Sequence, residues 1–285
     1  MLPRVACAAM PLAKLLRRLD LEALDRDLFL GDPGRGEGRL FGGMVAAQSV
    51  IAAGRTVSEG GLHSLHAYFL RPGRHDTPIR FVVDRIRDGR TFTTRRVVAH
   101  QGGEAIFNLA ASFARPEEGI AHQDPMPEAA PPETLRDWED VRAEIIGEPA
   151  ARRGDGPVEF RVCLPESADG TPQPAHQQNW FRPRGELPDD PLVHAAVLVY
   201  SSDRTLINTA ARPHGLRWGK RVAASLDHAL WLHQPARLGD WMLYASESPA
   251  AHAARGLVFG SMYTRDGVRV ASVAQEGLIR VPQGS

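Results

Sequence analysis

Residues 223–280 read AASLDHALWLHQPARLGDWMLYASESPAAHAARGLVFGSMYTRDGVRVASVAQEGLIR, and this stretch decides the fold. It holds three runs of strand-forming residues that are separated by turn-forming pairs. The last pair, Asp266-Gly267, joins GSMYTR to VRVASV and predicts a β-hairpin. The stretch therefore predicts antiparallel strands that follow one another along the chain.

The phase of the last strand makes Gln275 a candidate site residue. Side chains alternate between the two faces of a strand, so Gln275 shares its face with Ala271, Val273 and Ile279. Three of these four residues are apolar, and we expect their face to be buried. A neutral amide on a buried face needs hydrogen-bond partners.

The composition is that of an ordinary soluble chain of 285 residues, with 43% hydrophobic and 24% charged residues. Lysine plus arginine equals aspartate plus glutamate at 34 each, so the net charge favours neither nucleic acid nor an anionic membrane as partner. No stretch has the ~20 apolar residues of a membrane span. Two cysteines, Cys7 and Cys163, suit a reducing compartment, and we expect a cytoplasmic protein.

The first residues leave the true start open between Met1 and Met10. The run VACAAMPLA imitates a secretory signal peptide. The leucines that follow, at positions 12, 15, 16 and 19, have helical spacing and predict a domain's first helix over residues 11–24.

The chain reads as two copies of one plan, a buried helix followed by antiparallel strands. Residues 44–53 (MVAAQSVIAA) carry no charge, which predicts a helix buried on every side. Residues 192–202 predict the second helix, which starts after Asp190 with a proline in its first turn. Similar phrases after each helix, SLHAYFLRP and SLDHALWLHQP, indicate a duplication, with each helix wrapped by its own sheet.

Between the copies, residues 116–157 are rich in proline and lose periodicity, as a linker does. The expected organisation is an N-terminal domain over residues 1–115, the linker over 116–157 and a C-terminal domain over 158–285.

Asp203 is the second candidate. Leu192, Ala196, Val199 and Asp203 are four, three and four residues apart, so the carboxylate extends an apolar stripe to the C-terminal end of the second helix. Burial and the dipole of that helix both disfavour the ionised form, which suits a general base or a group that orients water. The alternative is a solvated loop start at Ser201-Ser202-Asp203.

Ser225 is the third candidate, a hydroxyl that shares one face of its predicted strand with Asp227. The alternative is an ordinary serine on a half-exposed strand. His66 and His228 occupy similar places in the two copies, where a lone histidine is more often a packing residue than a base.

Several familiar sites have no signature here. The chain has no H-E-x-x-H and no C-x-x-C, so we expect neither a metal nor a cofactor. It has no G-x-S-x-G elbow of a serine hydrolase, and neither cysteine is placed as a reactive thiolate.

Asp203, Ser225 and Gln275 offer a carboxylate, a hydroxyl and an amide that could converge on one water. Such a set suits hydrolysis of a thioester, because a thiolate with a pKa near ~8.5 leaves without a strong general acid. Spacing alone does not establish this chemistry.

The chain resembles the acyl-CoA thioesterase II family, the double-hotdog thioesterases, over residues 12–280. The similar phrases occur in the family's order: LFGGMVAAQSV (40–50), HSLHAYFLRPG (63–73), RDGRTFTTRRV (87–97), ASFARPEEG (111–119), WFRPRGELPDD (180–190), SLDHALWLH (225–233) and RGLVFGSMYTRDGVRVASVAQEG (255–277). One departure is Met44, where the family more often has glutamine. Gln48 lies one helical turn further on.

The resemblance implies an α+β chain of two tandem hotdog folds, each a central helix wrapped by a curved antiparallel sheet. It implies hydrolysis of fatty acyl-CoA to a fatty acid and CoA. The family's catalytic aspartate falls on Asp203, its serine or threonine on Ser225 and its glutamine on Gln275. It also implies one working site per chain, in the second copy, and association into a dimer or tetramer.

Two other functions stay open at this point. One is a hotdog hydratase or dehydratase of enoyl thioesters, although its usual histidine-carboxylate pair is not evident. The other is a non-catalytic acyl-CoA binding protein. Release of free thiol from a saturated acyl-CoA distinguishes a hydrolase from both.

Overall fold

The computed structural model describes residues 11–147, 156–216 and 218–281. The questions of the true start and of Cys7 lie outside these residues. No helix within the described ranges is long and apolar enough to cross a membrane.

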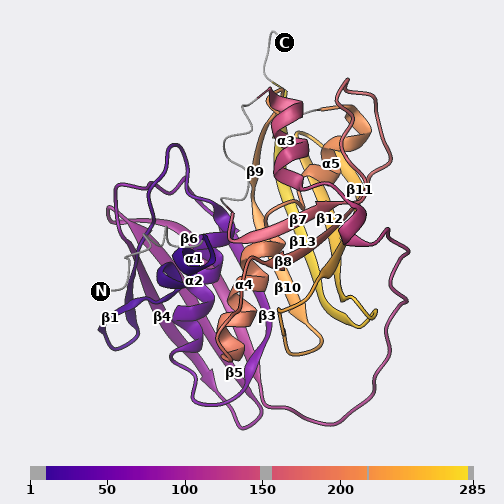
Figure 1. Ribbon diagram of the computed structural model, residues 1–285. Coiled ribbons are helices and arrows are strands. Elements are labelled where there is room, and N and C mark those ends of the chain that lie inside the picture. Colours follow the sequence, from indigo (N-terminus) through magenta and orange to yellow (C-terminus); the bar gives the residue numbers. More distant parts are fainter. Residues whose placement is uncertain (1–10, 148–155, 217, 282–285) are drawn as a thin grey trace, which may run out of the picture.

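From residue 11 to residue 115, the first half contains the predicted buried helix, preceded and followed by strands β1 to β6 (Figure 1). Helix α2 (Gly42–Gly54) is buried from Gly43 to Ala53, as its uncharged sequence predicts. Helix α1 ends at Leu19 instead of residue 24, because the chain turns at once into a short hairpin. The strands are β1 (Glu22–Asp25), β2 (Leu28–Gly31), β3 (Gly61–Phe69), β4 (Ile79–Asp88), β5 (Phe92–Gln101) and β6 (Glu104–Ala114), and α1 starts at Pro11.

The second half repeats this plan. Helix α4 (Pro191–Ser202) begins after Asp190, whose side chain accepts a hydrogen bond from the Leu192 amide and caps the helix. A short helix α5 (Asn208–Ala211) and a 3₁₀ turn η3 (Arg212–His214) follow. The strands are β7 (Val158–Val162), β8 (His176–Pro183), β9 (Val222–Ser225), β10 (Asp227–Leu232), β11 (Met242–His252), β12 (Arg255–Thr264) and β13 (Arg269–Arg280).

The two halves share one sheet, whereas the sequence analysis expected a separate sheet for each helix. The strand order is β1-β2-β4-β5-β6-β3-β10-β13-β12-β11-β8-β7, with β9 also paired to β13. Antiparallel pairing of β3 with β10, from Asp227 opposite Tyr68 to Trp231 opposite Ser64, joins the halves. Edge-to-edge pairing satisfies backbone groups that two separate sheets would leave open at this seam.

Helices α2 and α4 lie side by side and antiparallel at the centre of the molecule (Figure 1). Their approach is so close that a Cβ atom on Gly43 would lie 2.7 Å from the Tyr200 carbonyl oxygen. At the other end, a Cβ on Gly54 would lie 2.4 Å from Leu192. The antiparallel packing brings the beginning of α2 to the end of α4, where Asp203 lies.

The segment between the halves contains an element that the sequence analysis missed. After the 3₁₀ turn η1 (Pro132–Thr134), helix α3 (Trp138–Ile146) is capped by the Asp137 side chain and ends at Gly147 in the left-handed conformation. Trp138 packs edge-on against Trp218 at 5.1 Å, and Glu139 binds Arg204 at 2.5 Å. Helix α3 therefore braces the residue that follows Asp203.

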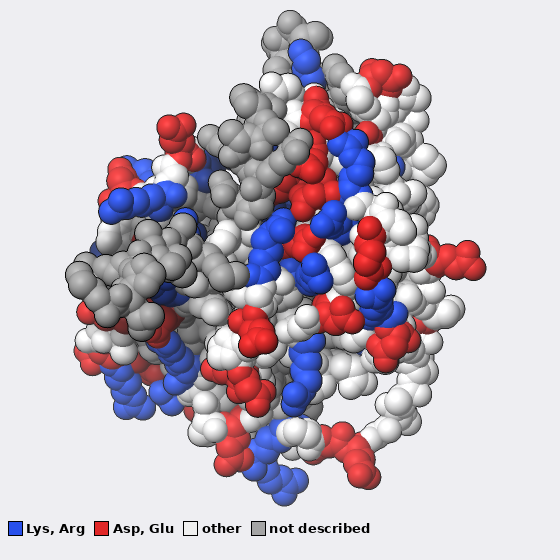
Figure 2. All heavy atoms as spheres, viewed as in Figure 1, with Lys and Arg blue, Asp and Glu red and all other residues white. Residues whose placement is uncertain are grey.

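The surface viewed in Figure 2 mixes cationic and anionic side chains over the whole face, without a broad field of one sign. This agrees with the equal totals of basic and acidic residues in the sequence.

Candidate active site

A cavity of about 390 Å³ lies between the two halves at the junction of α2 and α4. The first half contributes the start of α2 and apolar side chains of β3 and β6, and the second half contributes Asp203, Ile207 and residues 223–226. The apolar lining from the first half includes Leu40, Phe41, Val45, Phe69, Ile106 and Phe107. A ligand here would contact both copies of the repeat.

The three candidate residues meet at one side of this cavity. The Ser225 hydroxyl donates to Asp203 Oδ1 at 2.9 Å, and Gln275 Nε2 donates to the same oxygen at 3.1 Å. Gln275 Nε2 also donates to Ser225 Oγ at 2.5 Å. Residues 22 to 72 positions apart in the sequence thus form one closed triangle of hydrogen bonds.

Asp203 is the C-cap residue of α4 and is only 8% exposed. Burial raises the pKa of its carboxyl group. The nearby His228, the hydrogen bonds from Ser225 and Gln275, and the Gly43 amide each oppose that shift. The solvated loop start that the sequence left open is thereby excluded.

The Gly43 contact revises the electrostatics expected from sequence. The dipole of α4 disfavours a carboxylate at its C-terminal end, but the N-terminal end of α2 faces the same carboxylate and favours it. Gly42 has to be glycine, because a Cβ there would lie 2.9 Å from Asp203 Oδ2 and 2.5 Å from the Phe69 ring. The second oxygen of Asp203 therefore lies against the start of α2.

Gln275 lies on the buried face that its strand phase predicts, and its side chain is fully buried. It does not line the cavity, unlike Asp203 and Ser225. Both hydrogens of its amide nitrogen are taken by those two residues. In this arrangement Gln275 fixes its two neighbours rather than facing a ligand.

A β-bulge sets the direction of Ser225. Between the pairs Ser225–Gly277 and Ala229–Ala274, one strand advances four residues and its partner three. The extra residue breaks the predicted continuous strand into β9 and β10. The alternation that would put the Ser225 and Asp227 side chains on one face is therefore interrupted, and the two residues have different contacts. The Asp227 carboxylate accepts the Glu276 amide at 2.7 Å and secures the bulge.

His228 is a residue of the site that the sequence analysis assigned to packing. It is 1% exposed, with Nδ1 2.8 Å from Gln275 Oε1 and Nε2 2.8 Å from Ser202 Oγ. His66, which the repeat comparison placed at a similar position, is exposed and contacts Trp231 edge-on. Ala67, and not His66, lies opposite His228 in the pairing of β3 with β10, so the two histidines are on opposite faces of the sheet.

Gln48 does not take the place of the glutamine that the family more often has at Met44. Its amide nitrogen donates to the carbonyl oxygens of Arg18 at 2.8 Å and Asp32 at 3.0 Å. It therefore joins α2 to the N-terminal segment and not to the cavity. Burial raises the pKa of the Cys163 thiol to about 11, so Cys163 is no thiolate, as expected.

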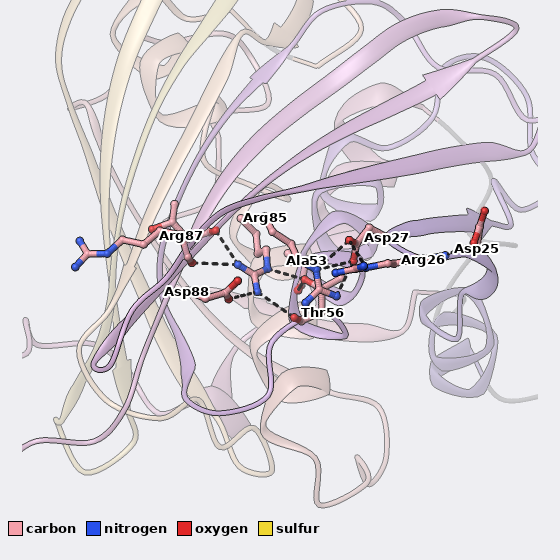
Figure 3. A network of polar contacts seen from close by, with 10 residues as sticks. Asp25, Arg26, Asp27, Ala53, Thr56, Arg85, Arg87 and Asp88 are labelled. Atoms are coloured by element: carbon pink, nitrogen blue, oxygen red, sulfur yellow. Dashed lines mark hydrogen bonds and ion pairs between the residues drawn. The ribbon is translucent and has the colours of Figure 1, made fainter.

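The corresponding end of α2 contacts a guanidinium, that of Arg95, where the end of α4 carries a carboxylate. Two of its partners, Thr56 and Asp88, are labelled in Figure 3. Arg95 is 1% exposed and donates to Thr56 Oγ1 at 2.8 Å and to the Thr56 carbonyl at 3.0 Å. It also pairs with Asp88 at 2.5 Å. These bonds close the helix end with a cation that cannot accept a proton from water.

We predict that Arg95→Leu destabilises the protein and leaves its chemistry intact. Removal of the guanidinium leaves two buried oxygens of Thr56 without this donor, so the free energy of unfolding should fall by about 2–4 kcal/mol. Urea denaturation checks this. The turnover of the folded variant should stay within about twofold of wild type, and a large loss of turnover at unchanged stability would show that this end of α2 takes part in catalysis.

Comparison with known proteins finds one family of relatives over most of the chain. A family model described as acyl-CoA thioesterase matches residues 150–278, and one described as the acyl-CoA thioesterase N-terminal domain matches residues 32–114. Acyl-coenzyme A thioesterase 8 of Mus musculus is 39% identical over 287 residues, which cover 94% of this chain and 89% of the mouse protein.

Two solved structures have a similar fold over almost the same length. The crystal structure of an acyl-CoA thioesterase II from Mycobacterium marinum has a TM-score of 0.79 and 40% identity, over 95% of this chain and 99% of that chain. A hot dog fold protein from Alicyclobacillus acidocaldarius has a TM-score of 0.79 at 19% identity, over 94% and 98% of the two chains, and bears on the fold alone. The prediction of two tandem hotdog folds is confirmed.

Proposed function

The chain belongs to the acyl-CoA thioesterase family and is a thioester hydrolase, and from this premise we propose how its residues carry out the reaction on acyl-CoA. The single observation that carries the proposal is the triangle of Asp203, Ser225 and Gln275 at the cavity wall. In this proposal Asp203 is the general base for water, Ser225 holds that water, and Gln275 fixes both.

The base atom is Asp203 Oδ2. Oδ1 already accepts hydrogen bonds from Ser225 and Gln275, whereas Oδ2 lies toward Gly42, which lines the cavity. A water between Oδ2 and the Ser225 hydroxyl gives its proton to Oδ2 as its oxygen attacks the thioester carbon. The pKa of Asp203 is raised by burial, which makes the carboxylate a stronger base than an exposed aspartate.

The beginning of α2 stabilises the charge that develops on the carbonyl oxygen. Gly42 opens the helix and lines the cavity, and its amide has no intrahelical acceptor. A helix N-terminus favours negative charge, so an oxyanion next to Gly42 is stabilised there. The tetrahedral intermediate then expels the thiolate of CoA, a good leaving group, and the carboxylic acid remains.

A fatty acyl chain fits the lining of the cavity. The inner wall is apolar, with Val45, Phe69 and Phe107 among its side chains, and burial of each methylene contributes about 0.8 kcal/mol. Arg39 and Arg71 line the same cavity. Their guanidinium groups suit the phosphates of CoA.

The experiment is a thiol-release assay with saturated acyl-CoA of several chain lengths, on wild type and two Ser225 variants. Ser225→Ala removes the hydroxyl and is expected to lower kcat about 10- to 100-fold. Ser225→Thr keeps the hydroxyl and is expected to stay within about fivefold of wild type. Full activity of Ser225→Ala would remove the hydroxyl from the mechanism, and wild type that binds acyl-CoA without releasing thiol would contradict the proposed reaction.

We also propose a division into residues 1–115, 116–157 and 158–285, in a cytoplasmic protein that associates into a dimer or tetramer. The strands of the two copies, β1–β6 and β7–β13, support the division. Edge strands are usually paired or covered, and β1 is the terminal strand at one end of the sheet, which supports association. The two cysteines support a reducing compartment.

A further inference from the structure

A closed ring of hydrogen bonds runs behind the proposed catalytic triangle. It passes from Asp203 to Gln275, from Gln275 to His228 and from His228 to Ser202, which precedes Asp203 on the chain. The three contacts measure 3.1, 2.8 and 2.8 Å. Ser202, His228 and Gln275 are at most 1% exposed, so water does not compete for these bonds.

The ring fixes which end of the Gln275 amide faces Asp203. An ionised carboxylate only accepts hydrogen bonds, so the amide nitrogen has to face Asp203 and the amide oxygen faces His228. An amide oxygen also only accepts, so His228 Nδ1 carries the hydrogen of that contact. A rotation of the amide by half a turn would set its oxygen against the Asp203 carboxylate and a nitrogen against the Nδ1 hydrogen.

Ser202 holds the other side of the imidazole. The Ser202 hydroxyl lies 2.8 Å from His228 Nε2 and 2.9 Å from the Val199 carbonyl oxygen, and its single hydrogen serves one of these two contacts at a time. The Tyr244 hydroxyl donates to the Ser202 carbonyl oxygen at 2.9 Å and ties β11 to the same point. Both ring nitrogens of His228 are thus engaged, and the imidazole cannot turn without breaking two buried contacts.

Resting on the proposed function, we propose that His228 is a positioning residue of this enzyme: its Nδ1 hydrogen orients the Gln275 amide so that Gln275 holds Asp203 and Ser225 for catalysis. His228 does not line the cavity, and its effect reaches the substrate only through Gln275. Nothing in this role requires the histidine to exchange a proton during turnover.

The test uses two substitutions that keep different halves of the imidazole. In His228→Asn the side-chain nitrogen falls near the position of Nδ1, and in His228→Gln it falls near that of Nε2. His228→Asn can donate to Gln275 and is expected to keep kcat within about fivefold of wild type. His228→Gln keeps the Ser202 side only, and its kcat is expected to fall about 30-fold with KM within about threefold.

Three controls accompany them. His66→Gln makes the same chemical change on the exposed histidine of β3, and Ser201→Ala removes a buried hydroxyl that donates to the Val197 carbonyl oxygen of its own helix at 2.7 Å. Both should keep wild-type kcat. Ser202→Ala removes the outer anchor and is expected to lower kcat about three- to tenfold. Thermal unfolding confirms that each variant is folded.

A double-mutant cycle separates this inference from the proposed function. On a Gln275→Ala background, His228→Gln should lower kcat by less than about twofold, because its target is gone. Equal losses in His228→Asn and His228→Gln, or an undiminished loss on the Gln275→Ala background, would overturn the positioning role. If Gln275→Ala itself keeps full activity, the role of Gln275 in the proposed mechanism is contradicted. If both His228 variants fail to fold, Ser202→Ala against Ser201→Ala decides, and equal kcat in these two overturns the inference.

Discussion

Asp203→Asn is expected to lower kcat for acyl-CoA hydrolysis about 10³-fold, which is the size of effect that a positioned general base contributes. The amide is nearly isosteric with the carboxylate, but it cannot take a proton from water. Its oxygen can still accept hydrogen bonds from Ser225 and Gln275 in place of Asp203 Oδ1. KM should change little, because the residue acts on water and not on the acyl chain. Thiol release under saturating substrate measures the loss.

The pH dependence of the wild-type enzyme tests the same assignment. Burial raises the pKa of Asp203, so the base is lost to protonation at a higher pH than the ~3.9 of an exposed aspartate. We expect kcat/KM to fall on the acid side with an inflection above that value. The residual activity of Asp203→Asn should lack this inflection.

The pH dependence of stability gives an independent check, because ionisation of Asp203 is expected to raise activity and to lower the stability of the fold. A carboxyl group whose pKa is raised by folding contributes stability below its unfolded pKa and loses it as the pH rises through the folded pKa. The free energy of unfolding of Asp203→Asn, measured relative to that of wild type, should therefore rise as the pH is raised from acid to neutral. Normal turnover in this variant, or an acid limb that persists in it, would refute Asp203 as the base.

Gln275→Glu is expected to have the second largest effect, about a 10²-fold fall in kcat at neutral pH. The substitution keeps the size of the side chain but sets a second carboxyl group at the place of the nitrogen that lies 3.1 Å from Asp203 Oδ1. Two carboxyl groups this close share a proton, which raises the pKa of the pair. The acid limb of the pH profile should move to higher pH.

A buried amide elsewhere in the second half serves as the control. Gln177 is 2% exposed and accepts a hydrogen bond from the Thr209 hydroxyl, and it does not line the cavity. Gln177→Glu should lower stability without moving the acid limb of the folded enzyme. A Gln275→Glu enzyme with wild-type kcat and an unmoved limb would show that Gln275 does not hold Asp203 during catalysis.

Local patterns predicted the two buried helices and the buried face of Gln275, whereas Asp203 and Ser225 were singled out by the resemblance to the family. The uncharged run at 44–53, the proline after Asp190 and the alternation around Gln275 each depend on one element and its immediate caps or turns. Such features can be predicted without knowing how distant elements pack, because the period of the apolar residues fixes which face of an element is buried. The helix α3 was also within reach, since Asp137 and Gly147 are its caps.

Features that depend on packing between distant elements could not be predicted. The Gly43 amide reaches Asp203 only because α2 and α4 are antiparallel, and a sequence does not state that approach. The bulge before His228 shifts one residue in the register of β10 and turns the imidazole inward. Without the bulge, an alternating pattern places Asp227 beside Ser225 and leaves His228 outside the site.

A single-turnover reaction in ¹⁸O-labelled water tests the central claim most directly. Wild-type enzyme in excess over acyl-CoA is quenched after one turnover, and the free acid and the peptide that contains Asp203 are analysed by mass spectrometry. If Asp203 activates a water that attacks the thioester, the acid carries one ¹⁸O atom and the Asp203 peptide carries none. Unlabelled acid together with ¹⁸O in the Asp203 carboxylate would mean that the carboxylate attacks the thioester itself, and would contradict the account.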